Sequence, residues 1–255
     1  MSLIEKLKAM PTSAPLYEFK KSEKFLYPSA EFLFVFYNVD GETVKELVPA
    51  PLKTAKSAAV ICFVAHYEKS CMASSPDTLT SWNSYNEAAT FIEVKLKTKT
   101  TRVKGWYCNS MFVDMDAAMA AGREIYGFPK KIAEIKLLDE NGNKVGIVKR
   151  NGIEIMRIKV ELTKDIDELP SGQAMKVITL KHLINPECNG IELSEFVLTE
   201  LVFDPKTIKM GSASIVFNKS ERDLIYLLKP KMNSVGVYTI SDGILPPGKV
   251  IHKIV

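Results

Sequence analysis

The sequence of 255 residues is poor in the residues that build covalent or metal cross-links. It contains four cysteines and three histidines, all widely spaced, and no Cys-x-x-Cys pair. Zinc sites and disulfide frameworks need such residues at short, regular spacings, so neither is expected here. We interpret the cysteines as single buried thiols in a reducing cytoplasm.

Long apolar runs are also missing. No stretch approaches the roughly 18 uninterrupted apolar residues of a membrane-spanning helix, and residues 1–8 contain no apolar signal region. We therefore expect a cytoplasmic protein without a membrane partner.

Arginine is scarce as well. The formal net charge of +4 comes almost entirely from lysine, because arginine occurs only at positions 102, 123, 150, 157 and 222. Nucleic-acid-binding faces usually cluster basic residues with arginine among them. Lys95, Lys97 and Lys99 instead alternate with uncharged residues, which is typical of the solvated face of a strand. No nucleic-acid partner is expected.

The composition itself, with 46% apolar and 25% charged residues, is that of a globular protein. A chain of this length buries roughly three-quarters of the surface that its unfolded form exposes, so its core needs no metal or disulfide. Strand-forming runs have the same density on both sides of the one linker-like stretch, 163–173. We therefore expect a single domain over residues 1–255.

Short runs of β-branched and aromatic residues, separated by turn residues, dominate the sequence and predict a mainly β fold (β-rich α+β). The expected strands are 31–38, 58–66, 89–99, 103–113, 132–138, 144–149, 153–162, 174–180, 191–203, 208–217 and 234–240. Asn141-Gly142-Asn143 and Asn151-Gly152 are hairpin signals, because Asn and Gly tolerate the positive φ of tight turns. This meander suggests a closed or nearly closed sheet.

Three short helices are expected, over 2–10, 41–47 and 114–125. Alanines favour the third helix, and Gly127 with Pro129 ends it. The residues just after this helix are therefore held at a fixed exit.

Two adjacent lysines follow that exit, at the end of the segment Gly122-Arg123-Glu124-Ile125-Tyr126-Gly127-Phe128-Pro129-Lys130-Lys131. A lysine is a useful covalent nucleophile only when unprotonated, which requires its pKa to fall from about 10.4 through desolvation or a neighbouring cation. Phe128 and its apolar neighbours can desolvate Lys130, and Lys131 can act as the cation. Adjacent lysines are more often two solvated side chains, so the pair alone does not establish a site.

The whole segment resembles the active-site motif of the acetoacetate decarboxylase family, in which Gly-Arg-Glu is followed at this spacing by aromatic-Pro-Lys-Lys. Three other stretches are similar to the family: Val48-Pro49-Ala50-Pro51-Leu52, Tyr85-Asn86-Glu87 and the C-terminal 242–251. The resemblance covers nearly the whole chain. It implies a closed, cone-like antiparallel β-barrel with few short helices, no cofactor and a homo-oligomer.

The resemblance also assigns roles to residues. Lys130 would be the Schiff-base lysine, Lys131 its electrostatic neighbour and Glu87 the acidic residue of the pocket. Four residues are expected to bind substrate: Glu31, Met111, Phe112 and Phe128. A charged pair at the end of the helix is expected to brace the turn that holds the lysine: Arg123 and Glu124.

Two positions depart from the family's pattern. The decarboxylases carry an Arg-Glu pair at a fixed distance before the Val-Pro segment. Counting back from Val48-Pro49, this chain has Ala30-Glu31 at that place. A second glutamate of the family aligns with Cys62. Lysine cannot reproduce the bidentate fork of an arginine, so the loss weakens the case for a carboxylate substrate. The Schiff-base lysine itself is unaffected.

Three functions follow from these observations. The first is a Schiff-base lyase that decarboxylates a 3-oxo acid such as acetoacetate to a ketone and carbon dioxide through a lysine imine and enamine. The second keeps the imine but runs aldol or dehydration chemistry on another oxo acid. The third is a non-catalytic β-barrel that binds a small apolar ligand.

Overall fold

A computed structural model of the chain describes residues 7–19, 23–73, 83–167, 173–232 and 234–255. The strands in these ranges are β1 (Leu7–Lys8), β2 (Glu18–Phe19), β3 (Lys24–Asp40), β4 (Ser57–Ala73), β5 (Asn83–Lys97), β6 (Arg102–Val113), β7 (Lys130–Ile132), β8 (Glu134–Glu140), β9 (Asn143–Arg150), β10 (Ile153–Asp165), β11 (Gln173–Ile184), β12 (Ile191–Phe217), β13 (Ser234–Leu245) and β14 (Lys249–Lys253). The helical segments are α1 (Asp116–Ala121), a π-helix (Gly122–Tyr126) and two 3-10 helices (Lys45–Leu47 and Leu224–Leu228). None of these helices is long and apolar enough to cross a membrane.

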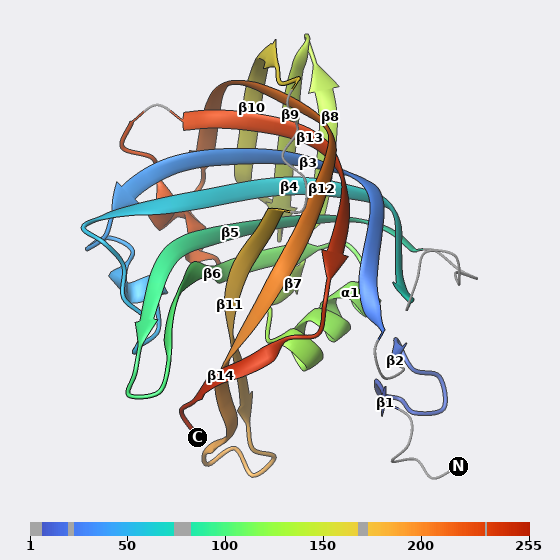
Figure 1. The fold of residues 1–255 in the computed structure, drawn as a ribbon, viewed down its shortest axis with the longest axis vertical. Helices are drawn as coiled ribbons and strands as arrows, with labels where there is room; N and C mark the ends of the chain where they lie inside the picture. Colours follow the sequence, from blue (N-terminus) through green and yellow to red (C-terminus); the bar gives the residue numbers. More distant parts are fainter. Residues whose placement is uncertain (1–6, 20–22, 74–82, 168–172, 233) are drawn as a thin grey trace.

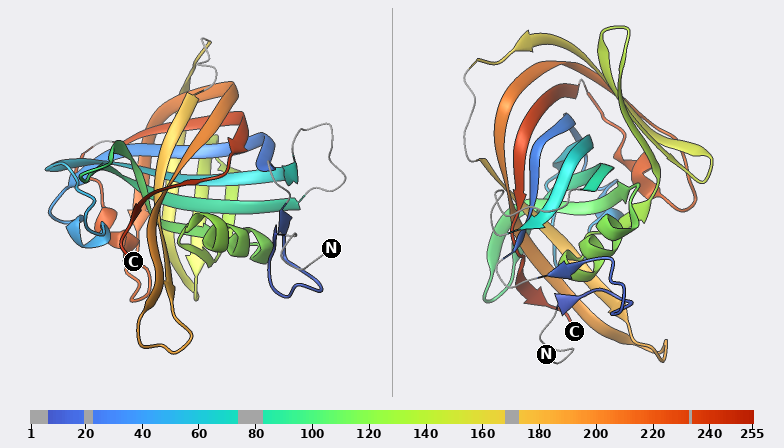
Figure 2. Two further views of the ribbon diagram at one scale, coloured as in Figure 1. Left: turned by 60° about the horizontal axis from the view of Figure 1, so that its bottom comes forward. Right: turned by 90° about the vertical axis from the view of Figure 1, so that its right-hand side faces the viewer.

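Twelve strands form one sheet with the order β11-β6-β5-β4-β3-β13-β12-β10-β9-β8, and β7 and β14 add to β6 and β12. Because β12 also pairs with β11, the strands from β11 to β12 close into a ring. In Figure 1, β3 to β6 run across the molecule, β13 begins beside β3 and then bends downward, and β11 and the lower part of β12 run steeply. Figure 2 shows the ring from two other sides. This confirms the expected mainly β fold built on a ring-closed sheet.

The ring closes through a short parallel contact, in which Val177 and Ile178 of β11 pair with Trp106 and Tyr107 of β6. The neighbouring pairs around the ring are antiparallel. Parallel pairing requires a long connection between the two strands, and β7 to β10 lie between β6 and β11 in the sequence. The closing seam therefore differs from the antiparallel arrangement that the resemblance implied.

Several sequence expectations about element boundaries were wrong. The expected strand 132–138 is interrupted at Ala133, between β7 and β8, and the expected helix 41–47 is helical only over Lys45–Leu47. The strands expected at 191–203 and 208–217 are one strand, β12, because a register shift between Pro205 and Thr207 lets the ladder with β13 continue. Leu7–Lys8, inside the expected helix 2–10, is a strand paired with Glu18–Phe19, so tertiary pairing overrides the amphipathic pattern. Residues 1–6 lie outside the described residues.

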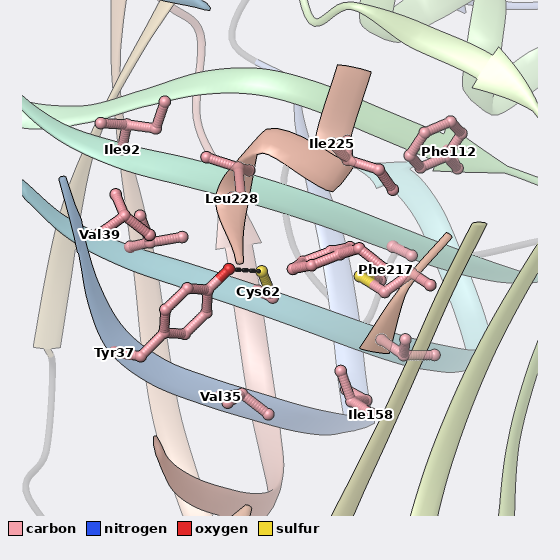
Figure 3. Packing of buried hydrophobic residues seen from close by; sticks show 14 of the residues in the cluster. Val35, Tyr37, Val39, Cys62, Ile92, Phe112, Ile158, Phe217, Ile225 and Leu228 are labelled. Atoms are coloured by element: carbon pink, nitrogen blue, oxygen red, sulfur yellow. Dashed lines mark hydrogen bonds between the residues drawn. The ribbon is translucent and has the colours of Figure 1, made fainter. Parts of the chain in front are cut away.

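Strands β3 to β6 separate two hydrophobic cores. Core 1 contains residues such as Val35, Tyr37, Cys62, Ile158 and Leu228, and packs β3 to β6 against β8 to β10 and the second 3-10 helix. Figure 3 shows part of it, with the Tyr37 hydroxyl and the Cys62 sulfur 3.2 Å apart. Successive side chains of a strand point to opposite faces, so the residues between those of core 1 form a second core.

Core 2 lies on the other face of β3 to β6 and is rich in aromatic rings. It includes Tyr27, Phe32, Tyr67, Tyr85 and Phe128, and it also contacts α1 and the π-helix. In Figure 2, α1 lies beside the ring near β1 and β2. The two lysines of the sequence motif lie on the short strand β7, which follows the π-helix in the chain.

Candidate active site

A sharp change from helix to strand brings Lys130 into core 2. The π-helix ends at Gly127, whose φ of 72° lies in the left-handed region. A Cβ added at Gly127 would also lie 2.6 Å from the backbone of Lys181, so glycine is needed for conformation and for space. Two residues after Phe128 the chain enters β7, where Lys130 pairs with Met111 of β6. Short π-helical turns often occur at functional sites.

Lys130 and Glu87 form a buried ion pair. Their residues are 6% and 7% exposed, and the Lys130 Nζ donates a hydrogen bond of 2.7 Å to Glu87 Oε2. The Tyr67 hydroxyl donates to the other carboxylate oxygen at 3.3 Å. The ammonium also lies 5.9 Å from the ring centroids of Tyr85 and Phe128. Two charges this deeply buried are stable only as a hydrogen-bonded pair, so Glu87 fixes the position of the lysine.

Three tyrosines surround this pair. The ring centroids of Tyr27 and Tyr85 lie 4.7 Å and 4.8 Å from that of Tyr67. Burial raises the pKa of each of these hydroxyls well above its ordinary value, and the negative charge of Glu87 raises it further. These groups therefore keep their protons at neutral pH and act as hydrogen-bond donors.

The π-helix packs directly against the lysine side chain. A Cβ added at Gly122 would lie 2.5 Å from Lys130 Cδ and 2.6 Å from its Cε. Arg123 Nη1 donates to the backbone carbonyl of Lys130 at 3.3 Å. Glu124 points elsewhere and accepts a 2.7 Å hydrogen bond from the hydroxyl of Tyr17. Of the two expected supports, only Arg123 contacts the lysine.

Two small cavities meet at Lys130, and Tyr27 and Leu245 also line both. The first, of about 70 Å³, is called the tyrosine cavity and has among its walls Tyr85, Tyr126, Asn83, Ala118 and Gly122. The second, of about 40 Å³, is called the phenylalanine cavity and has among its walls Phe32, Phe63, Phe128, Phe203, Met111 and Glu87. The described residues that line the two cavities include no arginine. Lys130 and Glu87 are the only charged side chains among them.

Lys131 does not face Lys130, contrary to expectation. Its ammonium donates to Asp223 Oδ1 at 2.7 Å and to the Arg222 carbonyl at 2.8 Å, and Arg150 Nε lies 3.2 Å from the other Asp223 oxygen. The two lysines are neighbours on a strand, so their side chains point to opposite faces. The charge of Lys131 is neutralised by Asp223 outside the cavities.

The same alternation corrects three other expectations. Phe112 belongs to core 1, as Figure 3 shows, whereas its neighbour Met111 lines the phenylalanine cavity. Glu31 lines neither cavity and accepts a 2.6 Å hydrogen bond from the Tyr238 hydroxyl. Cys62, onto which a second glutamate was aligned, also faces core 1. An acid at position 62 would not reach Lys130.

Ala30, which replaces the expected arginine, is fully buried in core 2. The site thus lacks that positive charge on the correct face of the sheet. Sequence reasoning missed Tyr27, Tyr67 and Tyr126. A signal for Tyr67 existed, because Phe63, Ala65 and Tyr67 share one face of β4 and Ala65 pairs with Glu87.

Comparison with known proteins identifies the family of this chain. The family model described as acetoacetate decarboxylase (ADC) matches residues 9–255. The chain belongs to the acetoacetate decarboxylase family. It is 27% identical over 254 residues to acetoacetate decarboxylase 2 of Mesorhizobium japonicum, an alignment that spans 96% of this chain and 88% of the relative.

Solved structures share the fold at lower sequence identity. The crystal structure of acetoacetate decarboxylase from Legionella pneumophila superposes with a TM-score of 0.76 at 23% identity, over 95% of this chain and 94% of the other. The enduracididine biosynthesis enzyme MppR, complexed with pyruvate, superposes with a TM-score of 0.74 at 16% identity, over 97% and 98% of the two chains. The fold therefore occurs in enzymes with different names, and the chemistry must be argued from the site.

Proposed function

We propose that this member of the acetoacetate decarboxylase family is a Schiff-base lyase that decarboxylates a 3-oxo acid to a ketone and carbon dioxide. The observation that carries the proposal is the buried Lys130–Glu87 pair at the junction of two cavities. A binding protein gains nothing from burying an amine and a carboxylate together, because both must be desolvated. An enzyme that forms an imine needs both groups at this place.

The pair can generate the nucleophile without help from Lys131. Proton transfer along the 2.7 Å hydrogen bond converts Lys130 to a neutral amine and Glu87 to a neutral acid, which removes both buried charges. The amine then attacks the 3-oxo carbon of the substrate. The departing oxygen takes one proton from the attacking amine and one from Glu87 and leaves as water. The product is an iminium cation that faces the restored carboxylate.

Decarboxylation uses this iminium as the electron sink. The C1–C2 bond breaks and carbon dioxide leaves, while its electron pair forms the C2–C3 double bond of an enamine and the imine π electrons move to nitrogen. C2 then takes up a proton, and water hydrolyses the resulting iminium to the ketone and free Lys130. One proton is consumed in each turnover. Glu87 is placed to pass on that proton, and the Tyr67 hydroxyl that donates to it holds its carboxylate in position.

Aldol or dehydration chemistry is the second candidate. The absence of arginine among the described cavity residues weakens the case for decarboxylation, because no guanidinium there binds the carboxylate that would be lost, and so keeps this alternative open. The fold relative MppR was solved with pyruvate, a 2-oxo acid. An enamine on Lys130 serves this chemistry equally well, because it can attack an aldehyde instead of taking a proton.

The test is borohydride trapping with acetoacetate and a panel of longer 2-oxo and 3-oxo acids, followed by peptide mass mapping and a carbon dioxide assay. Trapping at Lys130 with gas release supports decarboxylation, and trapping without gas moves the assignment to aldol-type chemistry. The absence of trapping with every oxo acid leaves a binding protein. Lys130→Met should abolish trapping and lower turnover by roughly 10³-fold or more. The matched control is Lys136→Met, which changes an exposed lysine of β8.

A further inference from the structure

The hydroxyl of Tyr126 is buried without a hydrogen-bond partner among the described residues. The residue is 0% exposed, and its ring centroid lies 6.1 Å from that of Phe25 and 5.8 Å from that of Phe128. Folded proteins pair nearly all buried hydroxyls, because an unpaired one loses its hydration and gains nothing. Tyr126 also lines the tyrosine cavity beside Lys130. The hydroxyl is thus an unpaired donor on a residue of the cavity wall, and it gains a partner if a ligand oxygen reaches it.

The two cavities differ in their tolerance for an oxygen-rich group. Glu87 lines the phenylalanine cavity but not the tyrosine cavity. Apart from Glu87, Lys130 and Tyr27 and Tyr67, the described walls of the phenylalanine cavity are apolar. A carboxylate there would lie beside another carboxylate in a setting of low polarity, which is costly. Polar substituents of a substrate are therefore expected in the tyrosine cavity, on the other side of Lys130.

Apart from Lys130, the polar groups of the tyrosine cavity are hydroxyl and amide groups without charge. Tyr27, Tyr85, Tyr126, Ser70 and Asn83 are among its walls. Burial raises the pKa of Tyr126 above its ordinary value, so its hydroxyl keeps its proton and can donate it in a hydrogen bond. Neutral donors can bind a carboxylate or a hydroxyl, although they provide less attraction than the missing arginine.

We propose that the tyrosine cavity is the subsite for an oxygen-bearing arm of the substrate, with the Tyr126 hydroxyl as its hydrogen-bond donor, and that the phenylalanine cavity holds an apolar arm. The inference rests on the proposed function, because it takes the reacting carbonyl carbon to lie at Lys130 Nζ. It defines the substrate class as a carbonyl compound with a carboxylate or hydroxyl on one arm and an alkyl chain on the other.

The volume of the phenylalanine cavity sets the length of that chain. One water position takes up roughly 10–15 Å³ on this scale, so a cavity of about 40 Å³ holds about three such positions. A methylene group is similar in size to a water molecule. The apolar arm is therefore expected to be a short alkyl chain of a few carbons.

The test compares two compounds with the same apolar arm. Borohydride trapping at Lys130 is titrated with 3-oxohexanoate and with 2-pentanone, which lacks the carboxylate. In Tyr126→Phe the half-saturating concentration of the acid should rise roughly ten- to hundredfold, while that of the ketone stays unchanged. Tyr37→Phe, which removes a hydroxyl from core 1, is the matched control and should change neither value.

Stability gives a second readout for the same variants. The Tyr126 hydroxyl has no partner among the described residues, so Tyr126→Phe should leave the melting temperature unchanged or raise it. Equal effects on acid and ketone, or no effect on either, would overturn the subsite assignment while leaving the imine chemistry intact. If wild-type protein is not trapped by either compound or by any oxo acid, the proposed function itself fails, and this inference with it.

A second variant tests the apolar arm. Phe203 lines the phenylalanine cavity, with its ring centroid 5.4 Å from that of Phe32. Phe203→Ala enlarges this cavity, so the preferred 3-oxo acid in a series of increasing chain length should become longer by two or more carbons. An unchanged preference would overturn the assignment of the apolar arm.

Discussion

Core 1 and core 2 are built by the same strands but have opposite characters. Core 1 is made almost wholly of aliphatic and aromatic side chains, and Val35, Val64, Ile158 and Leu228 are each fully buried within it. Core 2 has a larger share of aromatic rings and encloses the Lys130–Glu87 pair between two cavities. Successive side chains of a strand point to opposite faces of the sheet. Neighbouring residues can therefore serve different purposes, one in a densely packed core and the next in the candidate active site.

This separation has a physical advantage. A buried ion pair and two cavities stabilise a fold poorly, because charges lose hydration and cavity walls lose contacts. Core 1 supplies the buried apolar surface that offsets these losses. It lies between two groups of strands, β3 to β6 on one side and β8 to β10 on the other. Variants on the two faces should therefore affect different quantities, and the following changes test how complete that separation is.

The largest expected effect is on stability, from Ile158→Ala in core 1. Ile158 is fully buried, and truncating it leaves a cavity that costs about 2–5 kcal/mol of unfolding free energy. Below the unfolding transition, trapping at Lys130 should reach the same level as in wild type. The measurements are urea unfolding and borohydride trapping on the same preparation.

The matched change in core 2 is Met111→Ala, which removes a side chain beside Lys130. It should lower the efficiency of trapping as well as stability. Should Ile158→Ala reduce trapping of folded protein as strongly as Met111→Ala does, the two faces would not be independent.

The next effect is on activity, from Gly122→Ala. The added methyl would lie 2.5 Å from Lys130 Cδ, so the lysine side chain must move away from its place beside Glu87. Displacing a reacting group by about 1 Å costs up to roughly 10²-fold in rate. Stability should fall by less than in Ile158→Ala, because alanine favours a helix more than glycine does and so offsets part of the cost of loosening the buried ion pair. Turnover, trapping and thermal unfolding are measured together.

Gly190→Ala is the control for Gly122→Ala, because its added methyl meets only the side-chain amide of Asn185, at 3.4 Å. It should leave turnover unchanged. Wild-type turnover in Gly122→Ala would show that the lysine need not hold the position described here.

Much of the fold could be predicted from local signals. Hairpin turns at Asn141-Gly142 and Asn151-Gly152 have the positive φ values that these residues favour, 51° and 77° in the first and 50° and 80° in the second. The third helix and its end at Gly127 were also anticipated. The parallel seam between β6 and β11 was not, because it depends on a contact between strands that are distant in sequence.

The site was predicted less completely, and the reason lies in side-chain direction. The motif and the family resemblance identified Lys130 and Glu87, which the structure brings together. They could not show that Lys131 points away, or that Phe112 and Cys62 face core 1. A strand alternates its faces, so an error of one residue moves a side chain to the other core. Tyr126 was visible in the motif, but its unpaired hydroxyl depends on the packing around it.

A smaller effect is expected from Lys131→Met. Lys131 is part-exposed and pairs with the buried Asp223, which keeps Arg150 as a second partner. The change should cost about 1 kcal/mol of stability and alter turnover by less than about threefold, because the Lys131 charge is neutralised outside the cavities. Chemical unfolding and steady-state turnover provide the two values. A loss of turnover near that of Lys130→Met would restore Lys131 as the electrostatic neighbour of the nucleophile.

The smallest effect concerns Cys62, the core 1 residue onto which the sequence alignment placed a glutamate of the family. Burial raises the pKa of its thiol from 9.0 to about 12, so the folded protein holds almost no thiolate at pH 8. Above pH 9 the unfolded chain ionises and the folded chain does not, so stability falls as the pH rises from about 9 to about 12. Iodoacetamide at pH 8 should therefore label the exposed Cys188 in native protein and reach Cys62 only in denaturant. Mass mapping of both peptides gives the two labelling rates. If native Cys62 were labelled as fast as Cys188, core 1 would open readily in the folded protein. Core 1 would then be no less accessible to reagents than core 2, contrary to the comparison made above.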